Sequence, residues 1–224
     1  MSGYLGLEEA ERAIKLGAYH QAFEIFMAMV ESGEDPAFYK LCEMVLNQQL
    51  DDEEKQKFTQ RLFHDIQEGN GAAAYNAGVL YSRGIGFPKD IAKAIEMFSK
   101  AIARRVPQGY LALAKLYLSR PEGVPIISDQ MIIEYINNAV KGGEVEAAYL
   151  LGRMYAKGEV VKRDDHKAFT YLFAAAKQGH EEAKKAIMVL QVMYAGEKFE
   201  QEQKAAMGLV WKMKHPDLHE HDRD

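Results

Sequence analysis

The sequence has only one cysteine, Cys42, among its 224 residues. A single thiol cannot close an internal disulfide, and it excludes a zinc site built from several cysteines. The chain also lacks any run of about 18 apolar residues, so no membrane-spanning segment is predicted. The residues after Met1 lack the basic start and the apolar core of a signal peptide. Together these absences predict a cytoplasmic protein.

Basic residues are in slight deficit, since Lys and Arg number 28 against 33 Asp and Glu, for a formal net charge of −5. A face that binds nucleic acid usually makes its domain basic, so nucleic acid is not predicted as a partner. Proline is also scarce, with six residues, which favours helix. With 48% hydrophobic and 27% charged residues, the chain is expected to be globular rather than disordered.

Catalytic motifs are missing as well. Gly84 and Gly86 are predicted to be turn residues, because no strand precedes them and no lysine–serine ending follows, as a phosphate-binding loop requires. His64 and Asp65 adjoin within a predicted helix, with no serine or cysteine motif to complete a triad, and are interpreted as surface polar residues. Cys42 occupies a position at which an internal repeat of the sequence places small packing residues, so it is expected to be buried. No enzyme activity and no cofactor are therefore predicted.

The carboxyl-terminal residues 215–224 form a polar tail in which three histidines, His215, His219 and His221, occur with Asp217 and Asp222. His215 and His219 would share one face of a helix, so a metal site is conceivable. Pro216 and the terminal position favour a frayed segment, and no companion ligand cluster occurs elsewhere. No metal site is therefore predicted.

What the sequence does contain is an internal repeat. A small residue recurs at intervals of 36, 36, 38 and 36 residues, and a second small residue follows it five positions later in four of the copies. The first stands at Ala37, Ala73, Gly109, Ala147 and Ala183, and the second at Cys42, Gly78, Ala114 and Gly152. The second residue lets a paired helix approach closely, and each two-helix unit leaves an apolar face that its neighbour covers. The pattern predicts a tandem array of helix pairs.

The predicted fold class is all-α, an α-solenoid of about six helix–turn–helix repeats. Helix starts are expected at a capping box of Asp51 and Glu54, and after Asp90 as N-cap. The units are expected at residues 5–36, 37–72, 73–108, 109–146, 147–182 and 183–214, in one domain over residues 1–214. The last helix, over residues 198–214, is expected to expose Glu200, Glu202 and Lys204 and to bury Ala205, Met207, Leu209, Val210 and Trp211.

Two copies carry a more specific pattern. The first comprises Ala147, Tyr149, Leu151, Gly152, Tyr155, Gly158, Asp164, Lys167, Ala168, Tyr171, Ala175, Ala176, Gly179 and Ala183. The second comprises Ala73, Tyr75, Gly78, Tyr81, Gly84, Gly86, Asp90, Lys93, Ala94, Phe98, Lys100 and Ala101. Both resemble the Sel-one-like repeat, a subclass of the tetratricopeptide-like repeats, although Val160 stands where that family has a second loop glycine. The resemblance implies a right-handed superhelical scaffold for protein–protein interaction that is not itself catalytic.

In such scaffolds the first helix of each pair lines a concave groove, which the resemblance implies here too. The candidate groove residues are Tyr39, Tyr75, Arg83, Lys115, Tyr149, Arg153 and Lys157. Tyrosine and arginine provide rigid contacts of large area, so the row could anchor an acidic segment of a partner. The alternative is that the tyrosines pack between repeat units and the basic residues form a solvated face.

Two functions follow from this pattern. The first is a non-catalytic adaptor, a monomer that binds a protein or peptide in its groove. The alternative is an inhibitor or immunity-type protein that neutralises one enzyme or toxin, for which the acidic balance of the chain would suit a basic partner. The identity of the partner does not follow from the sequence.

Overall fold

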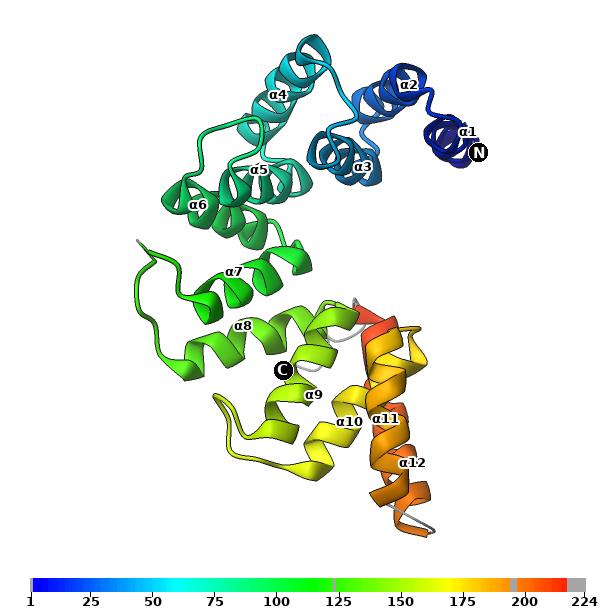
Figure 1. Cartoon of the computed structure of the whole chain (residues 1–224), viewed down its shortest axis with the longest axis vertical. Helices are drawn as coiled ribbons and strands as arrows, with labels where there is room; N and C mark the ends of the chain where they lie inside the picture. The colour runs from blue at the N-terminus through cyan, green and yellow to red at the C-terminus, as the bar shows by residue number, and fades with distance from the viewer. Residues whose placement is uncertain (1, 123, 194–196, 217–224) are drawn as a thin grey trace, which may run out of the picture. The chain divides into compact units, whose positions relative to one another are not determined.

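The chain folds into twelve helices in a computed structural model that describes residues 2–122, 124–193 and 197–216 (Figure 1). None of these described residues forms a strand. The predicted all-α fold of repeated helix pairs is therefore confirmed. The histidines and aspartates of the tail beyond residue 216 lie outside the described residues. The described chain divides into two compact units, residues 1–106 and 107–224, and each is described here by itself. The division into six repeats stays a prediction.

Unit 1 contains α1 (Ser2–Lys15), α2 (Tyr19–Glu31), α3 (Asp35–Leu46), α4 (Asp52–Gln67), α5 (Gly71–Arg83) and α6 (Ile91–Ala103). Helix α1 packs on α2, α3 packs on both α2 and α5, and α5 packs on α4 and α6. The core is built mainly from large apolar side chains that are almost fully buried, including Phe23, Phe26, Phe38, Leu41, Phe58, Leu62 and Leu80.

Unit 2 contains α7 (Pro107–Ser119), α8 (Asp129–Lys141), α9 (Val145–Lys157), α10 (Asp165–Lys177), α11 (Glu181–Met193) and α12 (Glu197–Lys214). The hairpins α7–α8 and α9–α10 stack through α8 and α9, and both α11 and α12 pack on α10. One apolar cluster runs through the unit and includes Ile132, Ile136, Leu151, Phe169, Leu172 and Val210.

The small residues of the repeat lie where helices cross. Gly78 and Gly152 are buried, on α5 and α9. A Cβ atom added at Gly78 would lie 2.6 Å from the ring of Phe98, and one at Gly152 would lie 2.7 Å from Cγ of Leu172. Cys42 is buried as predicted, and burial raises the pKa of its thiol to about 12. These residues therefore permit close packing, and Cys42 is not set up as a nucleophile.

The same caps end and begin the paired helices in the two best copies. Gly84 and Gly158 close α5 and α9 in the left-handed conformation, with φ of 70° and 73°. Asp90 and Asp164 then accept hydrogen bonds from the backbone of the third residue of α6 and α10, at 2.9 and 3.0 Å. The predicted capping box at the start of α4 is confirmed too. Local capping chemistry, repeated along the chain, thus sets the helix boundaries.

The loop between these caps differs at one position. Gly86 has φ of 72°, and Val160, at the equivalent place in the later copy, has φ of 67°. A β-branched residue is strained there, because its Cβ crowds the backbone.

Replacing Val160 with glycine is expected to raise the free energy of unfolding by roughly 0.5–1 kcal/mol. Relief of about 1–2 kcal/mol of strain exceeds the extra entropy that glycine gives the unfolded chain. Urea denaturation measures the change. The reciprocal Gly86→Val variant is the control, since nothing lies within 4 Å of its added Cβ. It should lose a similar amount, and a Gly86→Val variant as stable as the parent would contradict the assignment of strain.

Asp65 of α4 and Glu202 of α12 are both buried, which contradicts the sequence-based expectations. Asp65 was expected at the surface beside His64, but only 9% of its side chain is exposed. Its Oδ2 forms an ion pair with Nε of Arg61 at 2.8 Å. Arg61 also donates a hydrogen bond to the carbonyl oxygen of Val30, so that the pair joins α4 to α2. The periodicity of α4 alone does not show that α2 covers this side of the helix.

The register of α12 was also predicted wrongly. Glu202 is buried and forms an ion pair with His166 of α10, whereas Met207 and Trp211 are 49% and 52% exposed. Val210 is buried as predicted. The side chains of Glu200 and Ala205 lie outside the described residues. Helix α12 packs on α10, and its buried residues Ala206, Val210 and Met213 have a spacing of four and three residues, which places Met207 and Trp211 away from the buried face.

Candidate functional site

Four of the predicted groove residues lie in unit 2. Tyr149 is half-buried on α9, and its ring stacks on the imidazole of His180 with centroids 4.2 Å apart. One turn later, the exposed Arg153 places its guanidinium carbon 5.6 Å from the centroid of the Tyr149 ring. We call Lys115, Glu146, Tyr149, Arg153 and His180 the Tyr149 cluster.

Glu146 connects this cluster to the helix before it. Its carboxylate accepts hydrogen bonds from Nε2 of His180 at 2.8 Å and from Nζ of Lys115 on α7 at 3.1 Å. Nδ1 of His180 accepts a bond from the backbone N–H of Ala183 at 3.2 Å, in the first turn of α11. These bonds together specify the neutral imidazole with its proton on Nε2. One side chain therefore caps α11 and joins it to α9.

The environment of Glu146 favours its charged form. Partial burial raises the pKa of the carboxyl, but the hydrogen bonds from His180 and Lys115 outweigh it, so the pKa is lowered overall. A lowered pKa means that the contribution of these bonds to stability is present above the ordinary pKa of glutamate and is lost as the pH falls through the lowered one. At neutral pH the network is intact.

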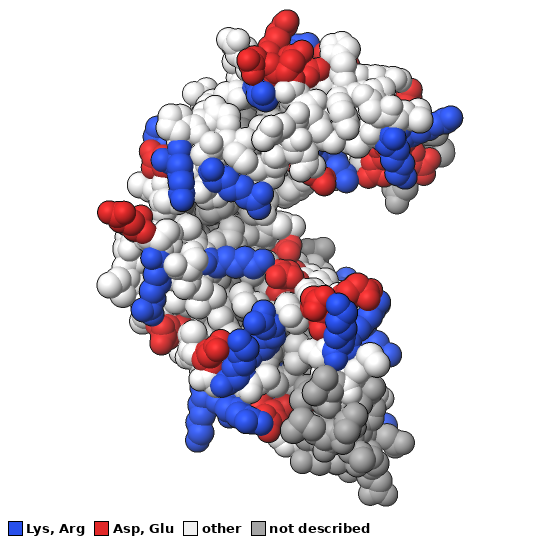
Figure 2. Space-filling model, viewed as in Figure 1, with Lys and Arg blue, Asp and Glu red and all other residues white. Residues whose placement is uncertain are grey.

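The cations on this surface differ in their pairing. Lys115 is paired with Glu146, and Lys157 lies 3.5 Å from Glu159. Arg153 makes no ion pair with any carboxylate in the described part of the chain, and its guanidinium lies against the ring of Tyr149. Figure 2 shows that positive and negative side chains are interspersed on the face in view, so most cations there have a carboxylate in the same region. Lys157 therefore lies outside the network, and Arg153 has donors available to a partner.

The other predicted groove residues lie in unit 1. Tyr39 of α3 and Tyr75 of α5 are half-buried, with ring centroids 5.7 Å apart, and Tyr75 also lies 5.9 Å from Phe98 of α6. Each of these two tyrosine rings thus contacts an aromatic ring on an adjacent helix. Arg83 is exposed in the last turn of α5, where a cation interacts favourably with the helix dipole.

Glu146 and His180 were not selected from the sequence. They are 34 residues apart, so no local spacing connects them. The available signal was the position of His180 directly before the acidic start of α11, which is an N-cap position. Only the stacking of α9 against the α10–α11 turn brings these two residues and Tyr149 together.

No group of three or more His, Cys, Asp or Glu side chains among the described residues could hold a metal ion. Within the same residues, no helix is both long and apolar enough to cross a membrane. Helix α9 offers an aromatic ring, an ordered carboxylate and a guanidinium that has no ion pair within the described residues, which are groups suited to binding.

The helices, caps and crossings define a helical repeat protein. The Sel1 repeat family model matches residues 71–105 and 145–180, and the chain contains two Sel1 repeats at these sites. The crystal structure of a Sel1 repeat protein from Oxalobacter formigenes is similar, with a TM-score of 0.62 and 22% identity over 94% of this chain and 84% of that one. That likeness supports the fold.

Two further structures are more distant. The protective antigen c5321 of uropathogenic Escherichia coli, which displays an SLR fold, has a TM-score of 0.43 and 17% identity over 88% of this chain and 49% of that one. The immunity protein Pa5087 from Pseudomonas aeruginosa has a TM-score of 0.38 and 20% identity over 82% of this chain and 84% of that one. No curated protein matches the sequence significantly.

Proposed function

We propose that this chain is a non-catalytic scaffold that binds a protein or peptide partner through the Tyr149 cluster. Sel1 repeats generally mediate protein–protein interaction, which is the background to the proposal. The observation that carries it is the exposed guanidinium of Arg153, which lies against the half-buried ring of Tyr149 without a carboxylate partner among the described residues. Tyrosine and arginine are enriched at binding hot spots, and a guanidinium held on a ring can donate two parallel hydrogen bonds to a carboxylate.

The neighbouring contacts support this role by ordering the ring. Tyr149 stacks on His180, which is itself held by Glu146 and by the first turn of α11. A contact surface that is already ordered loses less side-chain entropy when a partner binds. We infer that an acidic segment of the partner meets Arg153 and that an adjacent part of the same segment lies on Tyr149.

Replacing Arg153 with glutamate is expected to lower the affinity for the partner at least thirty-fold, which corresponds to about 2 kcal/mol. The combined Tyr149→Ala and Arg153→Ala variant should lose as much. Affinity purification followed by titration of the recovered partner measures the change. Lys162→Ala is the control, since Lys162 is an exposed cation of the same unit. Equal recovery of partner by the parent and both cluster variants, at an unchanged melting temperature, would refute the role of the cluster.

The alternative, an inhibitor or immunity-type protein, stays a prediction, as do the cytoplasmic location and the monomeric state. The same purification separates the two functions, because an inhibitor would recover one enzyme or toxin and suppress its activity at equimolar ratio. An adaptor would recover its partner without such suppression.

A further inference from the structure

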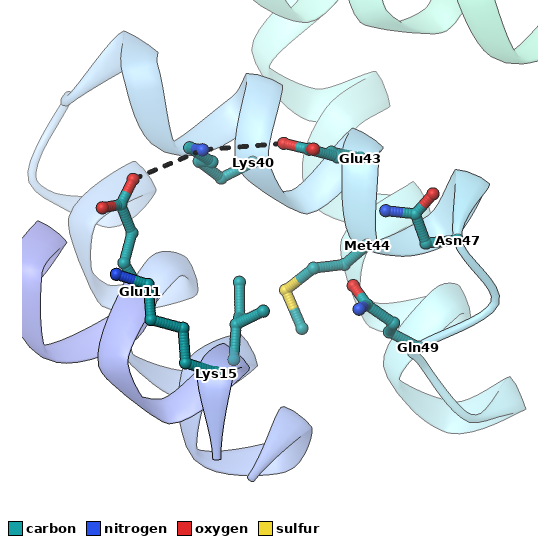
Figure 3. Close-up of a pocket in the computed structure, with 8 residues that line it drawn as sticks. Glu11, Lys15, Lys40, Glu43, Met44, Asn47 and Gln49 are labelled. Atoms are coloured by element: carbon teal, nitrogen blue, oxygen red, sulfur yellow. Dashed lines mark ion pairs between the residues drawn. The ribbon is translucent and has the colours of Figure 1, made fainter. Parts of the chain in front are cut away.

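A second surface of interest is a pocket in unit 1, between α1 and α3, which we call the α1–α3 pocket (Figure 3). Its volume is about 270 Å³. Met44 of α3, which is only 1% exposed, points into it, and Ile14 of α1 lines it as well. Pockets that hold whole small molecules usually measure about 300–1,000 Å³. The size and the apolar floor therefore suit one side chain of a larger partner.

One edge of the pocket carries excess negative charge. Nζ of Lys40 lies 3.3 Å from a carboxylate oxygen of Glu11 and 3.6 Å from one of Glu43 (Figure 3). A single ammonium group shared between two carboxylates leaves one negative charge uncompensated. All three side chains are at least 36% exposed, so this edge is open to solvent and to a partner.

A positive charge lies on the α1 side of the pocket, where Lys15 stands beside Glu11 (Figure 3). It stands four residues after Glu11, a spacing that commonly forms an ion pair on a helix. Because the carboxylate of Glu11 is directed to Lys40, Lys15 is left without an ion pair to any described residue.

Two side-chain amides complete the lining on the side of α3. Asn47 and Gln49 border the pocket beside Met44. Each amide offers both a donor and an acceptor, which is the pairing that a peptide group requires. The lining thus combines an apolar floor, opposite charges at two edges, and groups that match peptide backbone.

We propose that the α1–α3 pocket holds an apolar side chain of an extended peptide, which has a basic neighbour facing Glu43 on the α3 side and an acidic neighbour facing Lys15 on the α1 side. This inference rests on the proposed function, since it names the segment of a protein partner that unit 1 takes. Charge complementarity fixes the direction of the peptide, and the pocket selects its anchor residue.

A library of random 12-residue peptides, displayed on phage and selected on the full chain, tests the proposal. The enriched peptides are expected to share an apolar residue between an acidic and a basic one. Their affinities are then measured by fluorescence anisotropy on synthetic copies. The Asn47→Trp variant, which fills the pocket from an exposed position, should weaken binding at least ten-fold.

Charge variants give a second, independent measure. Glu43→Lys should also weaken binding at least ten-fold, whereas Glu53→Lys, the same change at an exposed site on α4, should leave it unchanged. Lys15→Glu should reverse the preference, so that a peptide with its acidic residue replaced by lysine binds better than the original. Circular dichroism confirms that each variant is folded, and if Asn47→Trp is not, the charge variants decide.

Three results would overturn the proposal: enrichment of peptides without the shared pattern, affinities unaffected by Glu43→Lys, or no peptide enriched by the parent chain. Failure here is separable from failure of the proposed function. If the Tyr149 cluster variants lose the partner while the pocket variants keep it, only the inference about the pocket is wrong. If the pocket variants alone lose it, the Tyr149 cluster is not the binding site.

Discussion

Replacing Arg61 with alanine is expected to lower the free energy of unfolding by about 3 kcal/mol. The change removes the ion pair with Asp65, whose side chain is only 9% exposed, and leaves its carboxylate with the contact to Nδ1 of His64 at 3.0 Å in place of a guanidinium. Breaking a buried pair costs roughly 3–5 kcal/mol, and the lower end applies because Arg61 keeps 27% of its side chain exposed. Urea denaturation followed by circular dichroism measures the loss.

Lys57→Ala is the matched control for this change. Lys57 lies on the same helix and also reaches α2, where its Nζ is 3.1 Å from Glu24, but both side chains are at least half exposed. An exposed pair contributes about 0–1 kcal/mol. The double variant Arg61→Met, Asp65→Leu removes both charges and should regain most of the loss. If Arg61→Ala and Lys57→Ala cost the same, burial of Asp65 has no energetic consequence and the explanation fails.

The second large effect is expected at Gly152. An added methyl group would lie 2.7 Å from Cγ and 3.0 Å from the backbone nitrogen of Leu172, so α9 and α10 would have to move apart. Overpacking of this kind costs about 1–3 kcal/mol, which exceeds the gain of up to about 1 kcal/mol from the better helix propensity of alanine. Gly152→Ala should therefore lower the free energy of unfolding by about 1–2 kcal/mol.

Gly208→Ala provides the comparison that isolates the crossing. Gly208 also lies within a helix of unit 2, but no atom lies within 4 Å of its added Cβ. Alanine should raise stability there by about 0.5–1 kcal/mol, because only the helix propensity changes. Thermal and urea unfolding of both variants give opposite signs if close approach is the purpose of Gly152. Two variants that are both stabilised would show that the helices have room at that position.

The elements that were predicted correctly depend on local chemistry. Asp51 and Glu54 cap α4 as expected, and Asp90 caps α6, because the side chain and the backbone N–H that it accepts from are three residues apart. Gly78 and Gly152 were placed at helix contacts because the repeat shows the same small residue in each good copy. Helix caps and small packing residues depend on contacts within one or two helical turns, so the sequence pattern was sufficient to predict them.

The errors concern which side of a helix is covered. Trp211 and Glu202 have hydropathies that argue for the reverse of their observed exposure, and Asp65 is a charged residue within a polar stretch. In each case the outcome depends on a helix distant in sequence: α10 pairs its His166 with Glu202, and α2 receives Arg61 beside Asp65. Periodicity identifies an apolar stripe, but it does not say which neighbour lies against the rest of the helix.

In the candidate site, too, the residues on one helix were predicted, whereas the contacts between helices were not. Tyr149 and Arg153 were selected from the sequence as candidate groove residues on the first helix of a pair, but Glu146 and His180, which order the ring, were not. The α1–α3 pocket was likewise absent from the sequence-based expectations, since Ile14 and Met44 come from helices α1 and α3, which are not adjacent in the chain.

By itself, the order of residues determined that this protein is all-helical and repetitive, with the caps and small residues that its hairpins require, because these depend on contacts within 3–4 residues or on a period that recurs along the chain. Only the tertiary structure decided which polar groups are buried, which cation lacks a partner and where a pocket opens. Those properties arise between helices some 30 residues apart, where stacking selects the faces that meet.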